Sequence, residues 1–325
     1  MRTLQVLLVA FALTGCISQM PADSPAASME GSAIAPAIID DASAVPALVD
    51  VPAWNVGDAW SMVSRWQGDE RRFHLVVTGV DAEGYVVETT DERMAGYDAM
   101  VDVSYIGRIR AADLAGSQEG TPVQFFAFPL EDGRTWSARW DGLTVALTAT
   151  KGARGFDILG LVDGEPYVAY DYVPDLRWWS KVEFLREGYT LSVERVETGW
   201  TGTTVTATAK KVFEGGPAAP VASSATGSFT IDEGQSYGVA TLVGGGTRWA
   251  RAFQLIDPSG APYGSTSISN VDTEGAGPRR VFLSEQFPPT PGEWRVVAPA
   301  VHDAEGGFWL RVHQVALTPR SVPAA

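Results

Sequence analysis

Gly234 to Gly238, "GQSYG", is the one segment whose residue types match an enzyme motif. A G-x-S-x-G string forms the nucleophile elbow of a serine hydrolase when it joins a strand to a helix and an acidic residue and a histidine follow. His302 and His313 lie downstream, but "VATLVGGG" directly after the motif is typical of a strand and a loop. A hydrolase that uses Ser236 is therefore the least favoured alternative, and we predict that the protein is not an enzyme.

The histidines and acidic turns supply metal donors without the spacing of a metal site. His74, His302 and His313 are far apart in the sequence, whereas structural zinc sites use donors in closely spaced pairs. Asp232-Glu233 lies in a turn, but no EF-hand or nonapeptide repeat surrounds it to make a calcium loop. We expect no metal and no cofactor, with the histidines as strand or surface residues.

The densest aromatic group contains four candidate ligand-contact residues: Tyr170, Tyr172, Trp178 and Trp179. Adjacent side chains of a strand point to opposite faces, so one tryptophan would join the core while the other is exposed or lines a concave surface. An exposed ring beside Arg177 and Lys181 would hold an apolar or sugar-like ligand. Packing inside the protein is the simpler interpretation. It applies equally to three further rings: Phe125, Phe126 and Phe128.

The N-terminus has the pattern of an export signal. Arg2 is followed by an apolar run from Leu4 to Leu13, which covers about 15 Å as a helix and hence only half of a bilayer core. Cys16, which follows this run, is the only cysteine in the chain. An intramolecular disulfide is therefore excluded.

Leu13-Thr14-Gly15-Cys16 resembles the lipobox of secreted lipoproteins, in which the cysteine is acylated and becomes the new N-terminus. The resemblance implies two or three acyl chains, each contributing about 0.8 kcal/mol per buried CH₂ to membrane anchoring. An ordinary signal peptide cleaved at a later site is the alternative. We expect an extracytoplasmic protein anchored to the outer leaflet of the cytoplasmic membrane, or to an outer membrane if the cell has one.

Length and charge limit the remaining possibilities. At 325 residues the chain is expected to form about two domains. Its formal charge of -15, from 24 basic and 39 acidic residues, would repel nucleic acid. Residues 17–52 contain no Lys, Arg, Trp, Tyr or Phe. We predict that they form a disordered tether, because they cannot bury enough apolar area to offset the entropy of ordering.

Residues 53–213 show alternating apolar segments broken by hairpin turns. The turn signals are Asp141-Gly142, Asp163-Gly164, Glu187-Gly188 and the longer loop 81–84. Only residues 92–118 leave room for a helix, and their periodicity is ambiguous. Successive hairpins predict an antiparallel meander rather than a βαβ fold.

Four motifs follow one another in this region: Trp54-Asn55-Val56-Gly57-Asp58-Ala59-Trp60, Phe128-Pro129-Leu130 with Gly133 and Trp136, Gly155-Phe156-Asp157, and Tyr172-Val173-Pro174-Asp175-Leu176. Their order resembles that of secreted prokaryotic domains of unassigned function. The curved antiparallel sheet of those domains is similar to the half-barrel of the LolA and LppX lipoprotein-carrier families. The resemblance implies a half-barrel-like fold and, as an alternative function, a carrier or chaperone for a lipid or other apolar ligand in the concave sheet.

The remaining chain predicts a second β domain. A linker at 214–225 is rich in Pro, Gly, Ala and Ser, and at least six short strands fill 226–318 before a tail at 319–325. This spacing predicts a small β-sandwich. The segments 291–294, "PGEW", and 306–312, "GGFWLRV", resemble prepeptidase-C-like and jelly-roll accessory domains. These families serve as binding or stabilising modules.

Taken together, the sequence predicts a mainly β protein, with a curved antiparallel sheet domain followed by a small sandwich. The expected function is a binding or structural role at the cell surface. The expected partners are the membrane, through the N-terminal lipid, and an apolar small molecule or a surface protein. Nucleic acid is not among them.

Overall fold

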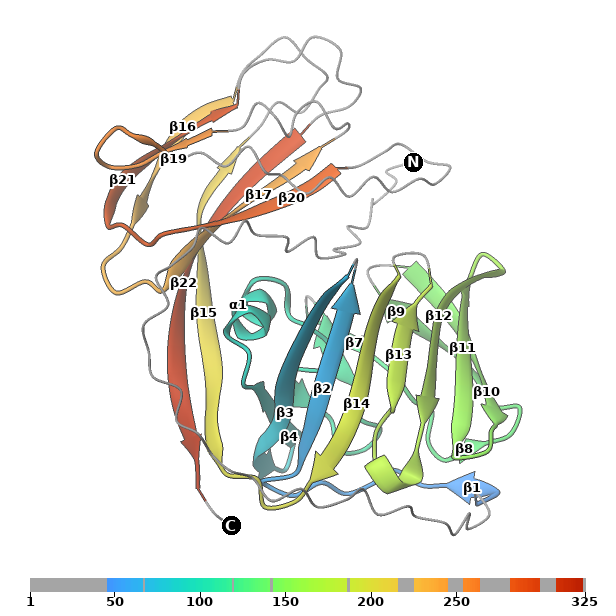
Figure 1. The fold of residues 1–325 in the computed structure, drawn as a ribbon. Coiled ribbons are helices and arrows are strands. Elements are labelled where there is room, and N and C mark those ends of the chain that lie inside the picture. The colour runs from blue at the N-terminus through green and yellow to red at the C-terminus, as the bar shows by residue number, and fades with distance from the viewer. Residues whose placement is uncertain are drawn as a thin grey trace.

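The computed structural model describes residues 46–66, 68–118, 120–140, 143–185, 188–215, 225–244, 254–263, 281–298 and 308–323. Within these ranges the protein is mainly β, with one α-helix, and its paired strands are antiparallel. The largest sheet has 14 strands and does not close into a barrel. Figure 1 shows its curved part below and a small sandwich above. The predicted fold class is therefore confirmed.

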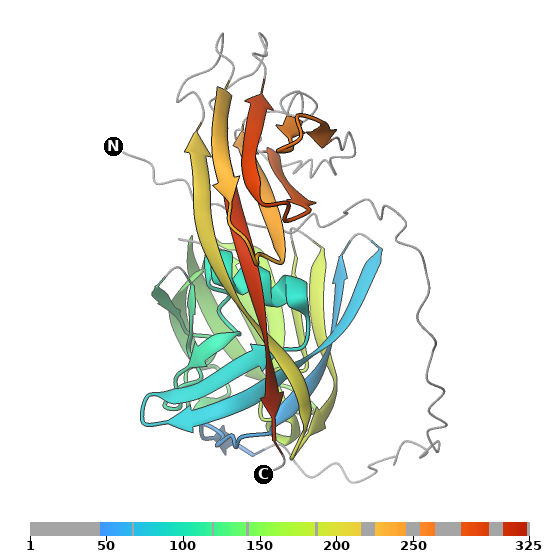
Figure 2. The same ribbon diagram turned by 90° about the vertical axis from the view of Figure 1, so that its left-hand side faces the viewer.

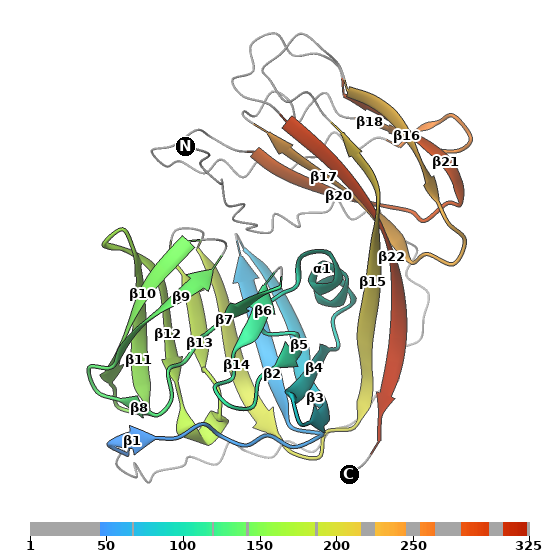
Figure 3. The same ribbon diagram turned by 180° about the vertical axis from the view of Figure 1, so that it is seen from behind.

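The curved part contains ten paired strands, which run in sheet order with β5 (Gly107–Ile109) beside the first: β4 (Gly84–Thr89), β3 (Asp69–Asp81), β2 (Ala59–Trp66), β14 (Tyr189–Glu197), β13 (Lys181–Phe184), β12 (Glu165–Tyr172), β11 (Phe156–Val162), β10 (Leu143–Lys151) and β9 (Thr135–Trp140). Two short pairs complete this half: β1 (Leu48–Val49) with β8 (Leu130–Glu131), and β6 (Gly116–Gln118) with β7 (Thr121–Val123). Figure 3 shows β5, β6 and β7 on the inner side of the curve.

The predicted hairpins are confirmed by the pairing of β3 with β4, β9 with β10, β11 with β12 and β13 with β14. The turn between β11 and β12 shows why such a residue pair forms a hairpin. Asp163 and Gly164 have φ angles of 52° and 84°, and this left-handed pair matches the right-handed twist of the strands that it joins.

The only described α-helix, α1 (Glu92–Val101), occupies the start of the ambiguous segment 92–118. Its N-cap is Asp91, whose carboxylate accepts the N–H of Met94 at 2.8 Å. The helix ends at Asp102, which has a φ of 55°. Figure 3 shows it beside the two long strands that lead out of the curved sheet.

These two long strands, β15 (Gly202–Gly215) and β22 (Phe308–Val322), pair along almost their whole length. We call them the ribbon. Near its lower end β15 pairs with β4, and near its upper end β22 pairs with β17 (Tyr237–Gly244), which is followed by β20 (Val281–Phe287). Figure 2 shows the ribbon running from the curved sheet into the sandwich.

The second sheet of the sandwich has four strands: β16 (Ala225–Ile231), β21 (Gly292–Ala298), β18 (Gln254–Ile256) and β19 (Pro262–Tyr263). It faces the upper end of the ribbon, β17 and β20 across a core that contains Trp294, Phe287 and Phe229. A larger core of aromatic and aliphatic side chains fills the curve below.

Three predicted boundaries differ in the structure. Residues 48–49, expected in the tether, pair with 130–131. Residues 214–215, expected in the linker, continue β15, and residues 319–322, expected in the tail, continue β22. The last two ends were misplaced because the ladder between β15 and β22 continues through Gly215 and Pro319.

Candidate functional site

The four aromatic candidates lie in the interior of the curved sheet. Tyr170, Tyr172, Trp178 and Trp179 have exposed fractions of 5, 1, 2 and 0%. Packing inside the protein, the simpler of the two interpretations, describes all four side chains, and neither tryptophan is exposed. The 3-10 turn Pro174–Leu176 interrupts the strand before them, so the alternation of faces does not apply.

The phenylalanine candidates pack into the same interior. Phe125 and Phe126 are buried, and Phe128 is half-buried against Phe126 and Tyr172. The ring of Phe126 lies 6.0 Å from that of Trp178, and other ring pairs of the group are 5.1 to 6.4 Å apart. Aromatic side chains therefore fill the centre of the curve.

The sequence motifs at the two ends of this domain hold each other in place. The indole N–H of Trp54 donates to the carbonyl of Arg177 at 3.1 Å, and that of Trp60 donates to the carbonyl of Leu176 at 2.8 Å. The buried carboxylate of Asp58 accepts the Arg177 guanidinium at 2.8 Å. Residues more than 110 positions apart thus form one buried contact, which gives these motifs a structural role.

Ser236 does not lie in a strand-turn-helix elbow. It is exposed in the turn before β17, and a strand follows it instead of a helix. Its hydroxyl oxygen accepts the N–H of Leu317 at 3.0 Å. The next residue, Tyr237, is buried against Gly96 of α1. These contacts give Ser236 and Tyr237 a structural role.

The other candidate donors of the sandwich are also engaged or buried. Burial, with Lys211 and Arg311 nearby, lowers the pKa of His313. Hydrogen bonds from Gln314 and then from the ammonium of Lys210 lower the pKa of Asp232. Among the described residues, no three His, Cys, Asp or Glu side chains are grouped closely enough to hold a metal ion.

Sequence reasoning missed a polar cluster on the outer face of the curved sheet. Ser61 of β2 lies with its Oγ 3.1 Å from Nε2 of His74 on β3. The same hydroxyl donates to Oε1 of Glu197 on β14 at 3.2 Å, and this carboxylate oxygen is 3.5 Å from the histidine nitrogen. A hydroxyl, an imidazole and a carboxylate therefore meet at one point. Nδ1 is the imidazole nitrogen that a triad carboxylate orients, whereas Glu197 is at Nε2.

The neighbours of this cluster leave it open to solvent. Arg195 donates to Oε1 of Glu197 at 2.6 Å, and the ring of Trp200 lies 5.7 Å from that of His74. The side chains of His74 and Glu197 are 31 and 27% exposed. A solute can therefore reach both.

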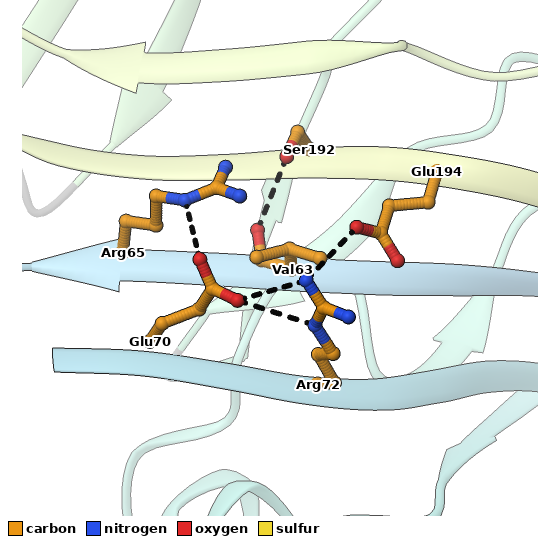
Figure 4. Close-up of polar contacts among 6 residues, drawn as sticks. All are labelled: Val63, Arg65, Glu70, Arg72, Ser192 and Glu194. Atoms are coloured by element: carbon orange, nitrogen blue, oxygen red, sulfur yellow. Dashed lines mark hydrogen bonds and ion pairs between the residues drawn. The ribbon is translucent and has the colours of Figure 1, made fainter.

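An ion-pair ladder continues along the same face, as Figure 4 shows. Glu70 accepts from Arg65 at 2.8 Å and from Arg72 at 2.9 Å, and Arg72 also lies 3.4 Å from Glu194. The two guanidinium groups lower the pKa of Glu70, mainly through the hydrogen bond from Arg65. We call this surface of β2, β3 and β14 the outer face. It contains nine polar residues: Ser61, Arg65, Glu70, Arg72, His74, Ser192, Glu194, Arg195 and Glu197.

The alternation of side chains between the two faces of a strand predicts which residues of β2, β3 and β14 share a face within each strand. The sequence alone gave no reason to set β14 beside β2, more than 120 residues away. The separation of its members along the chain therefore hid the cluster.

Leu13, Thr14, Gly15 and Cys16 lie outside the described residues, as does His302. The described part of the chain contains no helix that is long and apolar enough to cross a membrane. Comparison with known proteins finds no matching family model and no matching curated protein.

Proposed function

We propose that this protein is an extracytoplasmic lipoprotein, held to a membrane through Cys16, that binds a surface protein through its outer face. The observation that supports this binding mode is the aromatic filling of the curved sheet. Because the rings occupy the interior, the accessible polar side chains lie on the opposite side of the same strands. The protein then acts as a binding module and not as an enzyme.

The charges of the outer face suit reversible recognition. The side chains of Arg65, Arg72 and Glu70 are 50, 63 and 42% exposed, so their mutual ion pairs contribute little to stability. They can exchange these pairs for charges on a partner at small cost. Complementary charges across an interface mainly increase specificity and the rate of association.

The anchor is tested by fatty-acid labelling of cells that express the full chain. The native protein is expected to incorporate the label and to sediment with membranes, because Cys16 would be acylated. Cys16→Ala should abolish both. Labelling of the variant at the native level would contradict the anchor.

Binding through the outer face is tested by cross-linking in intact cells. The native chain is expected to give a defined cross-linked partner that is lost in the double variant Arg65→Ala/Arg72→Ala. Arg108→Ala is the matched control, because Arg108 pairs with Asp81 in an exposed ion pair elsewhere on the curved sheet. An identical pattern in all three proteins would contradict the proposal.

One observation favours the carrier alternative. The indole N–H groups of Trp140, Trp178 and Trp179 are buried with no partner among the described residues. A ligand carbonyl or carboxylate would satisfy such donors. Native mass spectrometry of the chain, released gently from membranes, would detect a bound lipid beyond the covalent anchor, and its reproducible presence would favour the carrier over surface recognition.

A further inference from the structure

The cluster of Ser61, His74 and Glu197 on the outer face contains two usual transition-metal ligands, an imidazole and a carboxylate, beside a hydroxyl. We propose that Ser61, His74 and Glu197 bind a divalent transition-metal ion such as Zn²⁺ through Oγ, Nε2 and a carboxylate oxygen. The inference is independent of the surface-protein partner proposed above. The third donor of the proposed site is the hydroxyl of Ser61, beside one imidazole and one carboxylate.

The spacing of the three donor atoms supports this assignment. They form a triangle with edges of 3.1, 3.2 and 3.5 Å. Zn²⁺ binds nitrogen and oxygen at about 2.0–2.2 Å in tetrahedral geometry, which sets neighbouring donors about 3.3–3.6 Å apart. The observed edges come within about 0.2 Å of that range. An ion just above the triangle would contact all three atoms and leave a fourth position for water.

The sheet fixes the donors before an ion arrives. Ser61 and His74 are directly opposite each other in the β2–β3 ladder, and Arg195 faces Ser61 on β14, two residues before Glu197. The indole of Trp200 lies against the imidazole. Donors carried by three paired strands need little reorganisation, which is what a binding site requires.

The negative net charge of the chain attracts a cation, whereas Arg195 beside the site competes with it. The chain carries a formal charge of -15, so its field favours cations near the surface. The local competitor is Arg195, whose guanidinium donates to the same oxygen of Glu197 at 2.6 Å. Its side chain is 68% exposed, so it can turn into solvent when an ion binds.

Calorimetric titration of the full chain in detergent with Zn²⁺ alone tests the site. One ion is expected per chain, and Co²⁺ should give the intense visible absorption of tetrahedral coordination. His74→Gln and Glu197→Gln should each weaken binding at least tenfold. Arg195→Gln should strengthen it, which a merely structural cluster would not do.

Two controls separate this site from other binding. His313→Gln and His302→Gln remove the other histidines of the chain and should leave the affinity unchanged. Circular dichroism establishes that each variant is folded. Absence of binding by both the native chain and Arg195→Gln would overturn the proposal, as would native affinity in folded His74→Gln or Glu197→Gln.

Discussion

The ion pair of Asp58 and Arg177 shows how much a single residue contributes to this fold. The Asp58 side chain is only 3% exposed and accepts both the guanidinium and the N–H of Asn55. Removing one member of a buried pair leaves the other without its counter-charge, which typically costs about 3–5 kcal/mol. The Arg177 side chain is 24% exposed, so we expect the cost of Asp58→Asn to be near the lower end of this range. Urea unfolding should show a loss of about 3 kcal/mol in the free energy of unfolding.

The exposed pair of Lys181 and Glu183 supplies the control for this measurement. Its side chains are 54 and 38% exposed, so Lys181→Ala should change the free energy of unfolding by less than about 1 kcal/mol. Equal effects of the two substitutions would show that the Asp58 contact does not hold the two motifs together.

Asp98 carries the clearest pH dependence at the residue scale. Burial raises its pKa to about 7, and the nearby carboxylate of Asp102 acts in the same direction. Because the folded pKa lies above the ordinary value of 3.8, the contribution of Asp98 to stability is greatest below about pH 4 and is lost as the pH rises through 7. Asp98→Asn should remove this loss and stabilise the protein at pH 8 by on the order of 1–3 kcal/mol.

Thermal unfolding between pH 4 and 8 measures this difference. Asp81→Asn is the control, because the hydrogen bond from Arg108 lowers the pKa of Asp81 below 3.8, so the effect of this substitution should not change between pH 4 and 8. If native and Asp98→Asn proteins have parallel pH profiles, Asp98 does not titrate in the folded state as described.

At the element scale, Gly96 of α1 packs closely against Tyr237 of β17 and Val315 of β22. A Cβ added to Gly96 would lie 1.5 Å from the hydroxyl oxygen of Tyr237 and 3.4 Å from Val315. Gly96→Ala would gain about 1 kcal/mol of helix propensity, but overpacking typically costs 1–3 kcal/mol or more. Because the overlap is severe, we expect a net destabilisation of at least about 1 kcal/mol in chemical unfolding.

A double-mutant cycle isolates the cause of this loss. In a Tyr237→Leu background the clashing hydroxyl is absent, so Gly96→Ala should become neutral or stabilising there. Additive effects of the two substitutions would indicate that α1 does not rest on Tyr237.

Elements could be predicted from sequence where the signal was local. The Asp163-Gly164 turn and the alternation around it fix a hairpin through backbone preferences alone. Trp178 and Trp179 could not be placed in this way, because Arg177 has a φ of 56° and ends a 3-10 turn. Alternation therefore breaks just before them, and the contacts of distant Trp54 and Trp60 with this turn decide its position.

At the scale of the whole molecule, the ribbon makes the two halves depend on each other. Where it joins the curved sheet, the buried carboxylate of Glu88 on β4 accepts the hydroxyl of Thr204 on β15 at 2.6 Å and contacts the guanidinium of Arg320 on β22. Farther up, β22 supplies Leu310 and Val312 to the core of the sandwich, and Val212 and Phe213 of β15 pack against it. At its lower end the ribbon packs against β2 and β3, where Val322 forms a small cluster with Ala59 and Val76. The ribbon therefore contributes buried side chains to both halves.

This sharing predicts a single cooperative unfolding transition for the full chain. Trp60→Ala should weaken the lower core and Trp294→Ala the upper core, since both side chains are at most 1% exposed, and each should cost about 3–5 kcal/mol. If β15 and β22 couple the halves, both variants shift the same calorimetric peak, and its calorimetric and van't Hoff enthalpies agree. If the halves unfold independently, Trp294→Ala splits the peak and leaves the part due to the curved sheet at its native temperature. One peak therefore means that the ribbon couples the stability of the sandwich to that of the curved sheet, whereas two would limit its role to covalent connection.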